Sequence, residues 1–121
     1  MEDQRIWEME EKLWHGGADV YDQLVDESVV MSLPAEPFIF SHQQAKDGVK
    51  NTPRWEAVSF SDQIVTRPHE GLIVIGYQVE AKRGEETYRC YASSTLMRRG
   101  HEDWTVIHHS QVVPPKAVVD A

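Results

Sequence analysis

LIVIGYQVEAK, at residues 72–82, and TYRCYASSTLMRR, at residues 87–99, are two long strand-like runs separated by a short turn. A similar run covers 104–113, and an earlier one covers 55–67. Runs rich in β-branched and aromatic residues, divided by turn residues, predict antiparallel hairpins. Long strands in a small protein coil strongly. We therefore expect a strongly curved antiparallel sheet, with a bend or break of the earliest run near Asp62.

The beginning of the chain has helical rather than strand-like spacing. Residues 3–14 place their Ile, Trp, Met and Leu side chains on one broad stripe of a helix, and Glu10 falls outside that stripe with other acidic residues. Gly16 and Gly17 end this helix, and glycine at such a place predicts a left-handed turn. A second short helix follows, with a buried side that we expect to contain Val20, Tyr21, Leu24 and Val25.

The segment before the long runs predicts one more strand and one more helix. Ser28–Leu33 (SVVMSL) is rich in β-forming residues and stops before Pro34. Ser41 and Gln44 have the spacing of a capping box, in which each side chain bonds the backbone N–H of the other residue. We expect a short helix from there to about Gly48.

Length and composition indicate a single folded domain. The chain has 121 residues, of which 40% are hydrophobic and 26% are charged, values typical of globular proteins. A chain of this length can bury roughly two-thirds of its unfolded surface in one core. We therefore expect one α+β domain over residues 1–113, with helices packed in the curved sheet, and a C-terminal tail at 114–121.

Charge and cysteine content limit the partners. The chain has 20 acidic and 12 basic residues and a formal net charge of −8, which repels nucleic-acid phosphates and anionic lipids. No apolar run approaches the roughly 20 residues needed to span a bilayer. We therefore expect a cytoplasmic protein with neither nucleic acid nor membrane as a partner. Cys90 is the single cysteine, so the chain has no internal disulfide.

The order helix, helix, strand, short helix and long antiparallel meander resembles the nuclear-transport-factor-2-like (NTF2-like) superfamily, the cone-shaped fold shared with ketosteroid isomerase. More narrowly, three strings of this sequence resemble the SnoaL-like group, also called DUF4440. They are Ala18–Tyr21 (ADVY), Trp55 with Ser61–Asp62, and Trp104–Gln111 (WTVIHHSQ). The resemblance implies a pocket on the concave side of the sheet, closed by helices, and a homodimer through the other side. It does not imply one activity, because this fold supports many functions.

Each long strand offers two sets of side chains to such a pocket, because side chains alternate across a strand. We expect the set Ile73, Ile75, Tyr77 and Val79 to face inward. Pattern alone hardly separates the two sets of the next run, and in the last run the resemblance favours Thr105, Ile107, His109 and Gln111. The expected ligand-binding residues are Trp14, Tyr21, Met31, Trp55, Tyr77, Tyr91, Ser93, Thr95, His109 and Gln111.

Proton transfer of the ketosteroid-isomerase type needs a carboxylate base and neutral hydrogen-bond donors in the cavity. Tyr77 and Tyr91 could donate, but no side chain that we expect inward is Asp or Glu. Asp62 or Glu80 could supply a carboxylate only if a bulge reversed the local strand faces. The polyketide-cyclase branch of the family implies an aspartate on the last strand where Gln111 stands, and glutamine cannot carry a proton.

His109 is the inward candidate that can exchange protons near neutral pH. It could be the acid/base of an isomerase or lyase, or a hydrogen-bonded core or ligand-orienting residue. We expect no metal site, because His108 and His109 point to opposite faces, and no cofactor, because no Gly-rich phosphate loop is present. Cys90 is expected to face away from the pocket without a nearby base, which argues against a nucleophilic role.

Three functional hypotheses follow from these observations. The first is a homodimeric protein that binds a small, largely apolar molecule in the cone, with catalysis possible but not required. The second is an isomerase or lyase, or a dehydratase or cyclase, that works without metal through His109 and tyrosine donors. The third is a non-catalytic interaction module. The face expected to form the homodimer is apolar and contains Tyr88, Ala92, Leu96, Trp104 and Val106.

Overall fold

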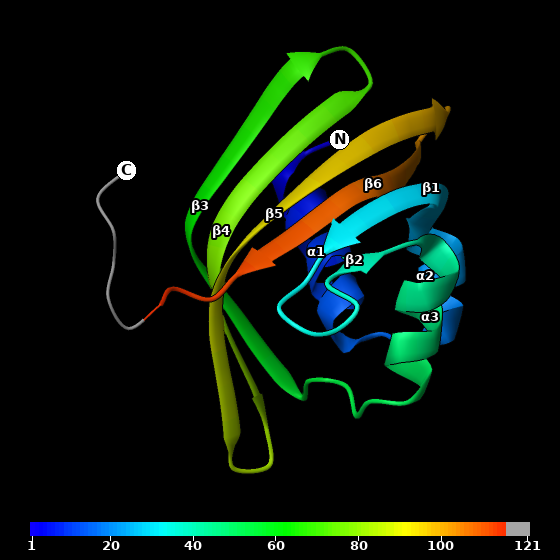
Figure 1. Ribbon diagram of the computed structural model, residues 1–121. Helices are drawn as coiled ribbons and strands as arrows, with labels where there is room; N and C mark the ends of the chain where they lie inside the picture. Colours follow the sequence, from blue (N-terminus) through cyan, green and yellow to red (C-terminus); the bar gives the residue numbers. More distant parts are fainter. Residues whose placement is uncertain (116–121) are drawn as a thin grey trace.

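The computed structural model describes residues 1–115, which form three helices and one six-stranded sheet (Figure 1). The helices are α1 (Asp3–His15), α2 (Ala18–Leu24) and α3 (His42–Lys50). The strands are β1 (Val25–Ser32), β2 (Ile39–Phe40), β3 (Ala57–His69), β4 (Leu72–Arg83), β5 (Glu86–Gly100) and β6 (Asp103–Val112). The predicted α+β architecture is confirmed. Of the tail predicted at 114–121, residues 116–121 lie outside the described residues.

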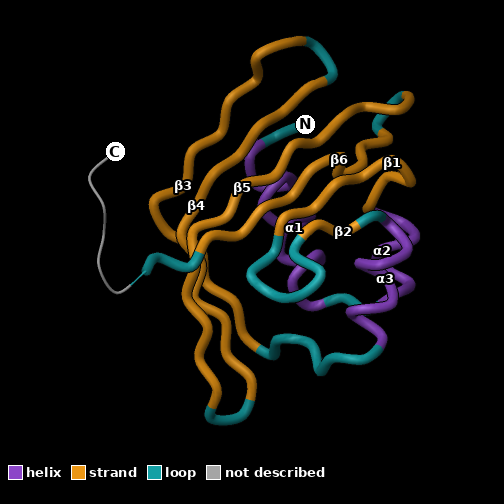
Figure 2. The backbone as a smooth tube through the Cα atoms, in the orientation of Figure 1, coloured by secondary structure: helices purple, strands orange, loops and turns teal. Residues whose placement is uncertain are grey.

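The sheet has the strand order β2-β1-β6-β5-β4-β3. Neighbouring strands are antiparallel except β1 and β6, which pair in parallel. The long strands β3 to β6 coil strongly and the sheet stays open (Figures 1 and 2). Helix α1 contacts β3, and α2 and α3 pack beside β1, so the helices close one side of the curved sheet. This is the cone that the sequence predicts.

Local sequence signals account for the helix ends. Ser41 Oγ accepts the Gln44 backbone N–H at 3.3 Å, and Gln44 Oε1 accepts the Ser41 N–H at 2.9 Å, so the predicted capping box is confirmed. The left-handed turn expected at the end of α1 is wrong, because Gly16 has a φ of −80°. Glycine is needed there for space: a Cβ at Gly16 would lie 2.4 Å from the Cβ of Val20.

Strand β4 alternates as predicted. Ile73, Ile75, Tyr77 and Val79 are at most 4% exposed, and they form one apolar cluster with Ile6, Trp14 and other residues. A second cluster joins Leu13, Tyr21, Val29 and Met31 under α2 and α3. The bend expected in β3 is a shift in strand pairing around Asp62, which has a positive φ of 51°.

The faces expected for β5 are wrong. Cys90, Ala92, Ser94 and Leu96 are buried, whereas Tyr91 is 50% exposed and Ser93 and Thr95 share its face. The cause is the tight turn that joins β4 to β5. Arg83 pairs with Glu86 across this turn, so Ile75 lies opposite Ser94, and Tyr77 lies opposite Ala92. Directly opposite residues share a face, which places the even-numbered residues of β5 inward.

Strand β6 changes face part way along. Leu96 pairs with Val106 and Thr95 pairs with His108, so Ile107 is an extra residue, and a bulge of this kind re-aims the following side chains. Val106 and His109 are therefore both buried, at 0% and 3% exposure. The inward prediction agrees with the structure for His109 and is wrong for Thr105 and Ile107, which are only partly buried.

The predicted dimer surface is wrong in composition for the same reasons. Ala92, Leu96 and Val106 belong to the core cluster, and Tyr88 and Trp104 pack against it. The opposite face of the sheet exposes a different apolar set, which includes Val30, Tyr91 and Val112. Within residues 1–115, no helix combines the length and apolar character needed to cross a membrane.

Candidate functional site

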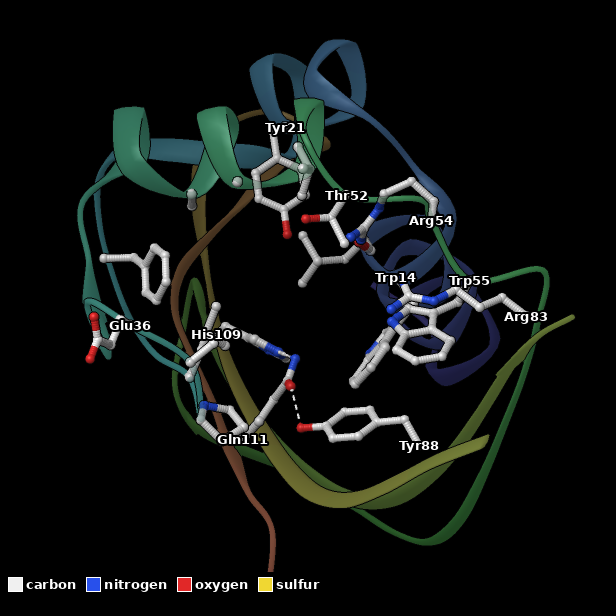
Figure 3. Close-up of a pocket in the computed structure, with 18 residues that line it drawn as sticks. Trp14, Tyr21, Glu36, Thr52, Arg54, Trp55, Arg83, Tyr88, His109 and Gln111 are labelled. Carbon is white, nitrogen blue, oxygen red and sulfur yellow. Dashed lines mark hydrogen bonds between the residues drawn. The ribbon is translucent and has the colours of Figure 1, made fainter. Parts of the chain in front are cut away.

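A cavity of about 320 Å³ opens between the helices and the concave face of the sheet (Figure 3). This volume is at the small end of the range for ligand pockets. Its lining comes from α1, α2, α3, the loop after β1, the segment before β3 and strands β4 to β6. Its aromatic and polar lining includes Trp14, Tyr21, Thr52, Arg54, Trp55, Arg83, Tyr88, His109 and Gln111.

Aromatic side chains form one wall of the pocket. The rings of Trp55 and Tyr88 stack with centroids 5.6 Å apart and planes 13° from parallel. Trp14 lies beside them, 6.2 Å from Tyr88 and 6.1 Å from the His109 ring. The Arg83 guanidinium covers the Trp55 ring at 4.1 Å, a cation–π geometry that fixes the indole. The wall is therefore aromatic, and its Trp55 ring is held by contacts with Tyr88 and Arg83.

Polar groups from β5 and β6 continue from this wall. The Tyr88 hydroxyl donates to Gln111 Oε1 at 2.8 Å, and Gln111 Nε2 lies 3.1 Å from His109 Nε2 (Figure 3). Burial raises the pKa of Tyr88, because it disfavours the phenolate. The Tyr88 hydroxyl therefore stays a donor, and it holds the Gln111 amide against the imidazole.

Behind His109 lies a group that we name the carboxyl cluster: Glu10, Tyr77, Ser94 and His109. Glu10 is fully buried, and its Oε2 accepts the Tyr77 hydroxyl at 2.5 Å and the Ser94 hydroxyl at 2.6 Å. Ser94 Oγ lies 2.7 Å from His109 Nδ1, and that nitrogen is 3.6 Å from Glu10 Oε2. One helix and three strands thus bring their polar groups together inside an apolar core.

These contacts assign the proton on His109. The Ser94 hydroxyl donates to Glu10, so His109 Nδ1 must carry the hydrogen that points to Ser94 Oγ. His109 Nε2 then accepts from the Gln111 amide. The imidazole is therefore neutral, and its Nε2 has a lone pair on the Gln111 side. A ring in this state can accept a proton.

Glu10 Oε1 has no hydrogen-bond partner among the described residues, although it is buried. Buried polar atoms without a partner are uncommon in folded proteins. The oxygen lies in the same carboxyl group that Ser94 connects to His109. The cluster therefore has acceptor capacity that its own hydrogen bonds do not use.

Tyr77 was expected to donate into the pocket, but its hydroxyl is committed to the core. It donates to Glu10 and accepts the Trp14 indole N–H at 2.9 Å. Burial, followed by the nearby Glu10, raises the pKa of Tyr77 well above its usual value. Tyr77 fixes Glu10 and Trp14, and it does not line the cavity.

A second polar group, which we name the arginine corner, consists of Tyr21, Thr52 and Arg54. Arg54 donates from Nε to the Gly16 carbonyl at 2.7 Å and from Nη2 to the Leu13 carbonyl at 2.8 Å, so it fastens the end of α1. Burial lowers the pKa of Arg54, and burial raises the pKa of Tyr21. The Tyr21 and Thr52 oxygens point into the cavity beside the guanidinium (Figure 3).

The structure brings half of the predicted ligand-binding set together. Trp14, Tyr21, Trp55, His109 and Gln111 line the cavity. The other half does not reach it: Met31 and Tyr77 are buried in the two core clusters, and Tyr91, Ser93 and Thr95 lie on the opposite face of the sheet.

Sequence reasoning missed Glu10, Arg54, Tyr88 and Ser94. Glu10 was expected to face solvent, and the expectation that no acidic side chain points inward is therefore wrong. The short turn between β4 and β5 was a usable signal for Ser94 and Tyr88, because it sets the register. The same register makes Cys90 face the core at 1% exposure, rather than away from it, and burial raises the pKa of its thiol. Within residues 1–115, no three His, Cys, Asp or Glu side chains gather as a metal site.

Solved structures share this architecture. An NTF2-like protein from Cytophaga hutchinsonii superposes with a TM-score of 0.76 and 16% identity, over 93% of this chain and 99% of that one. A protein described as a candidate ketosteroid isomerase from Parabacteroides distasonis gives 0.74 and 17% identity, over 90% and 86%. The association domain of C. elegans CaMKII gives 0.72 and 13% identity, over 91% of each chain.

No protein-family model matches the sequence, and no curated protein matches it. The narrower SnoaL-like resemblance therefore stays a prediction. At identities of 13–17%, the structural matches indicate the fold and do not indicate an activity. The three matches nevertheless cover 90–93% of this chain. The protein has the NTF2-like fold, the α+β cone that ketosteroid-isomerase-like proteins also have.

Proposed function

We propose that this protein binds a small molecule with a flat, largely apolar body in the cavity of its cone. The observation that carries the proposal is the aromatic wall of Trp14, Trp55 and Tyr88, which borders an open volume of about 320 Å³. Pockets that are mostly apolar with a few polar groups are typical of small-molecule sites. A compound of one or two rings matches the size of this cavity.

The polar end of the wall supports binding of a hydrogen-bonding group. One N–H of Gln111 is used by His109, and the second has no acceptor among the described residues. The Tyr88 hydroxyl and His109 hold this amide in place. A carbonyl oxygen on the ligand could therefore accept from Gln111 without any rearrangement of the pocket.

Binding can be tested with a panel of bicyclic aromatic compounds, neutral and charged, by calorimetry and by thermal unfolding. We expect compounds that bind to raise the midpoint of unfolding and to quench tryptophan fluorescence, since Trp14 and Trp55 line the cavity. Trp55→Ala should remove both effects. Phe38→Ala is the matched control, because Phe38 is an exposed aromatic residue that does not line the cavity. Failure of every compound to stabilise the wild type would contradict the proposal.

A second candidate function is proton transfer by His109, and the carboxyl cluster favours it. A proton taken from a ligand carbon by His109 Nε2 can be balanced by movement of the Nδ1 proton to Ser94 and of the Ser94 proton to Glu10. Return of the proton to another carbon completes an isomerisation. For this step a ligand must take the place of the Gln111 amide at Nε2.

The probe for this second function is β-tetralone, a bicyclic ketone with acidic C–H groups. In D₂O, we expect the wild type to speed its hydrogen–deuterium exchange, followed by NMR, and His109→Gln to abolish the gain while the protein stays folded. Exchange no faster than in buffer would rule out the catalytic candidate and leave ligand binding intact. Loss of folding in both His109→Gln and His109→Ala, with no exchange in the wild type, would mark a core histidine.

The homodimer and the interaction role stay proposals, now on a different surface from the predicted one. Tyr91 and Val112 are paired across β5 and β6 and are 50% and 59% exposed, and Val30 on β1 is 48% exposed. A second copy of this chain would cover such a sheet face. Sedimentation at several concentrations tests it, and Tyr91→Glu should shift the protein to monomer. The cytoplasmic location also stays a prediction.

A further inference from the structure

Arg54 is the arginine whose charge the described residues leave unpaired. Each of the other arginines in residues 1–115 makes an ion pair with Asp or Glu at 2.5–3.3 Å. The chain as a whole carries a net charge of −8, so acidic side chains are abundant. A half-buried guanidinium without a carboxylate is therefore unusual in this protein, and it lies in the wall of the cavity.

The geometry of Arg54 leaves donors available on the cavity side. A guanidinium has five N–H groups, and two of them are used by the Gly16 and Leu13 carbonyls. The Tyr21 hydroxyl is also close enough to interact with the guanidinium, and the remaining donors lie on the cavity side near Thr52 (Figure 3). The backbone bonds hold the guanidinium rigidly, so a ligand group would meet a preorganised donor set.

Neighbouring charges favour an anion at this place. Arg83 also lines the cavity, and its charge acts against that of Arg54 and contributes to lowering the Arg54 pKa after the larger effect of burial. Arg83 is itself paired with Glu86 at 2.9 Å, which leaves Arg54 as the uncompensated member. Glu36, the acidic residue of the lining, lies toward the opposite side of the cavity (Figure 3).

We propose that the ligand of the cavity carries a carboxylate, which the arginine corner binds while the apolar body of the ligand packs against Trp14, Trp55 and Tyr88. The inference rests on the proposed function and specifies its ligand class as aromatic or alicyclic carboxylic acids. A single negative charge matches the one guanidinium that the described residues leave without a carboxylate, whereas a doubly charged phosphate would keep one charge unmatched in the cavity. A planar carboxylate also matches the fork of an arginine.

The test uses naphthoate and its neutral amide, naphthamide, which have nearly the same shape. We expect calorimetry to show that the wild type binds naphthoate at least about tenfold more tightly than naphthamide, since charge-assisted hydrogen bonds are the stronger ones. Arg54→Gln should reduce naphthoate to the affinity of naphthamide. Arg89→Gln is the matched control, because Arg89 is an exposed arginine paired with Glu80 outside the cavity, and it should change neither affinity.

Two further measurements keep the test decisive if Arg54→Gln unfolds. Arg54→Lys retains the charge but loses the fork, so naphthoate should weaken several-fold and naphthamide should not. Raising the ionic strength to about 0.5 M should weaken only naphthoate. Equal binding of both compounds overturns the carboxylate inference and leaves small-molecule binding standing, as does an unchanged preference in Arg54→Gln. Absence of binding by naphthoate and by the whole panel overturns both.

Discussion

The carboxyl cluster reaches the cavity through His109 alone, the arginine corner lines the cavity directly, and the two groups differ in how their charges are compensated. Glu10 is fully buried and receives hydrogen bonds from Tyr77 and Ser94. Arg54 is partly exposed, donates to two backbone carbonyls, lies beside the Tyr21 hydroxyl, and has no carboxylate partner within residues 1–115. The Glu10 carboxyl does not line the cavity, although its Oε1 has no partner among the described residues, so its two hydrogen bonds contribute to the fold. The Arg54 guanidinium does line the cavity, so a ligand can reach its charge.

Substitution of Glu10 should lower the stability of the protein the most. Glu10→Ala removes the acceptor of two buried hydroxyls, each of which costs roughly 1–3 kcal/mol when left unsatisfied, in addition to the cavity left by the side chain. We expect a loss of about 3–5 kcal/mol in the free energy of unfolding, measured with urea. Glu11→Gln on the exposed side of α1 is the control. Equal stability of the two variants would show that the cluster contributes little to the fold.

Asp26 provides a compensated carboxylate outside the cavity. The Ser28 hydroxyl and N–H and the Arg99 guanidinium donate to it and hold its pKa at about 2. Because the folded pKa is lower than the unfolded one, the stabilisation is present above pH ~4 and is lost as the pH falls toward 2. Asp26→Asn should cost about 2 kcal/mol at neutral pH and much less at pH ~2.5. A pH-independent difference would contradict this account.

Arg54 should matter less for stability than either carboxylate. Arg54→Ala frees the Gly16 and Leu13 carbonyls, but water can reach a partly exposed site, so we expect a loss of about 1–2 kcal/mol. Urea unfolding measures it alongside Glu10→Ala. A loss as large as that of Glu10→Ala would mean that the arginine corner is built for the fold rather than for a ligand.

The smallest effect should come from Tyr88, which connects the aromatic wall to His109. Tyr88→Phe loses one hydrogen bond to Gln111, worth about 1 kcal/mol. The Gln111 amide is then free to turn over, so the preference of His109 for the Nδ1–H tautomer should weaken. Nitrogen chemical shifts of the imidazole report the tautomer. An unchanged tautomer would indicate that Ser94 and Glu10 hold it without help from Gln111.

The elements of the fold followed from local sequence, and the faces of the strands followed only in part. The inward set of β4 and the capping box of α3 were predicted from alternation and spacing, and both are confirmed. On β5 the pattern was ambiguous, because Tyr and Ser residues occur on both faces. The register set by the short turn with β4 decided the matter.

The candidate site depended on side chains whose orientation does not follow the regular period of a strand or helix. A bulge at Ile107 places both Val106 and His109 inward, and a one-residue irregularity of this kind has no reliable signature in a single sequence. Glu10 was assigned to the exposed side of its helix, because a carboxyl group is normally costly to bury. Its partners Tyr77 and Ser94 lie 67 and 84 residues away in the chain, so their compensation was not visible locally.

The sequence by itself determined the α+β class, the boundaries of three helices and five strands to within a few residues, the long coiled strands and the aromatic character of the pocket, but it missed the short strand β2. These depend on spacing and residue type within one segment, where backbone geometry relates sequence to structure directly. Only the tertiary structure decided that Glu10, Ser94 and His109 form one cluster and that, within residues 1–115, no carboxylate pairs with Arg54. Both depend on contacts between distant segments, whose register is set by turns, bulges and packing together.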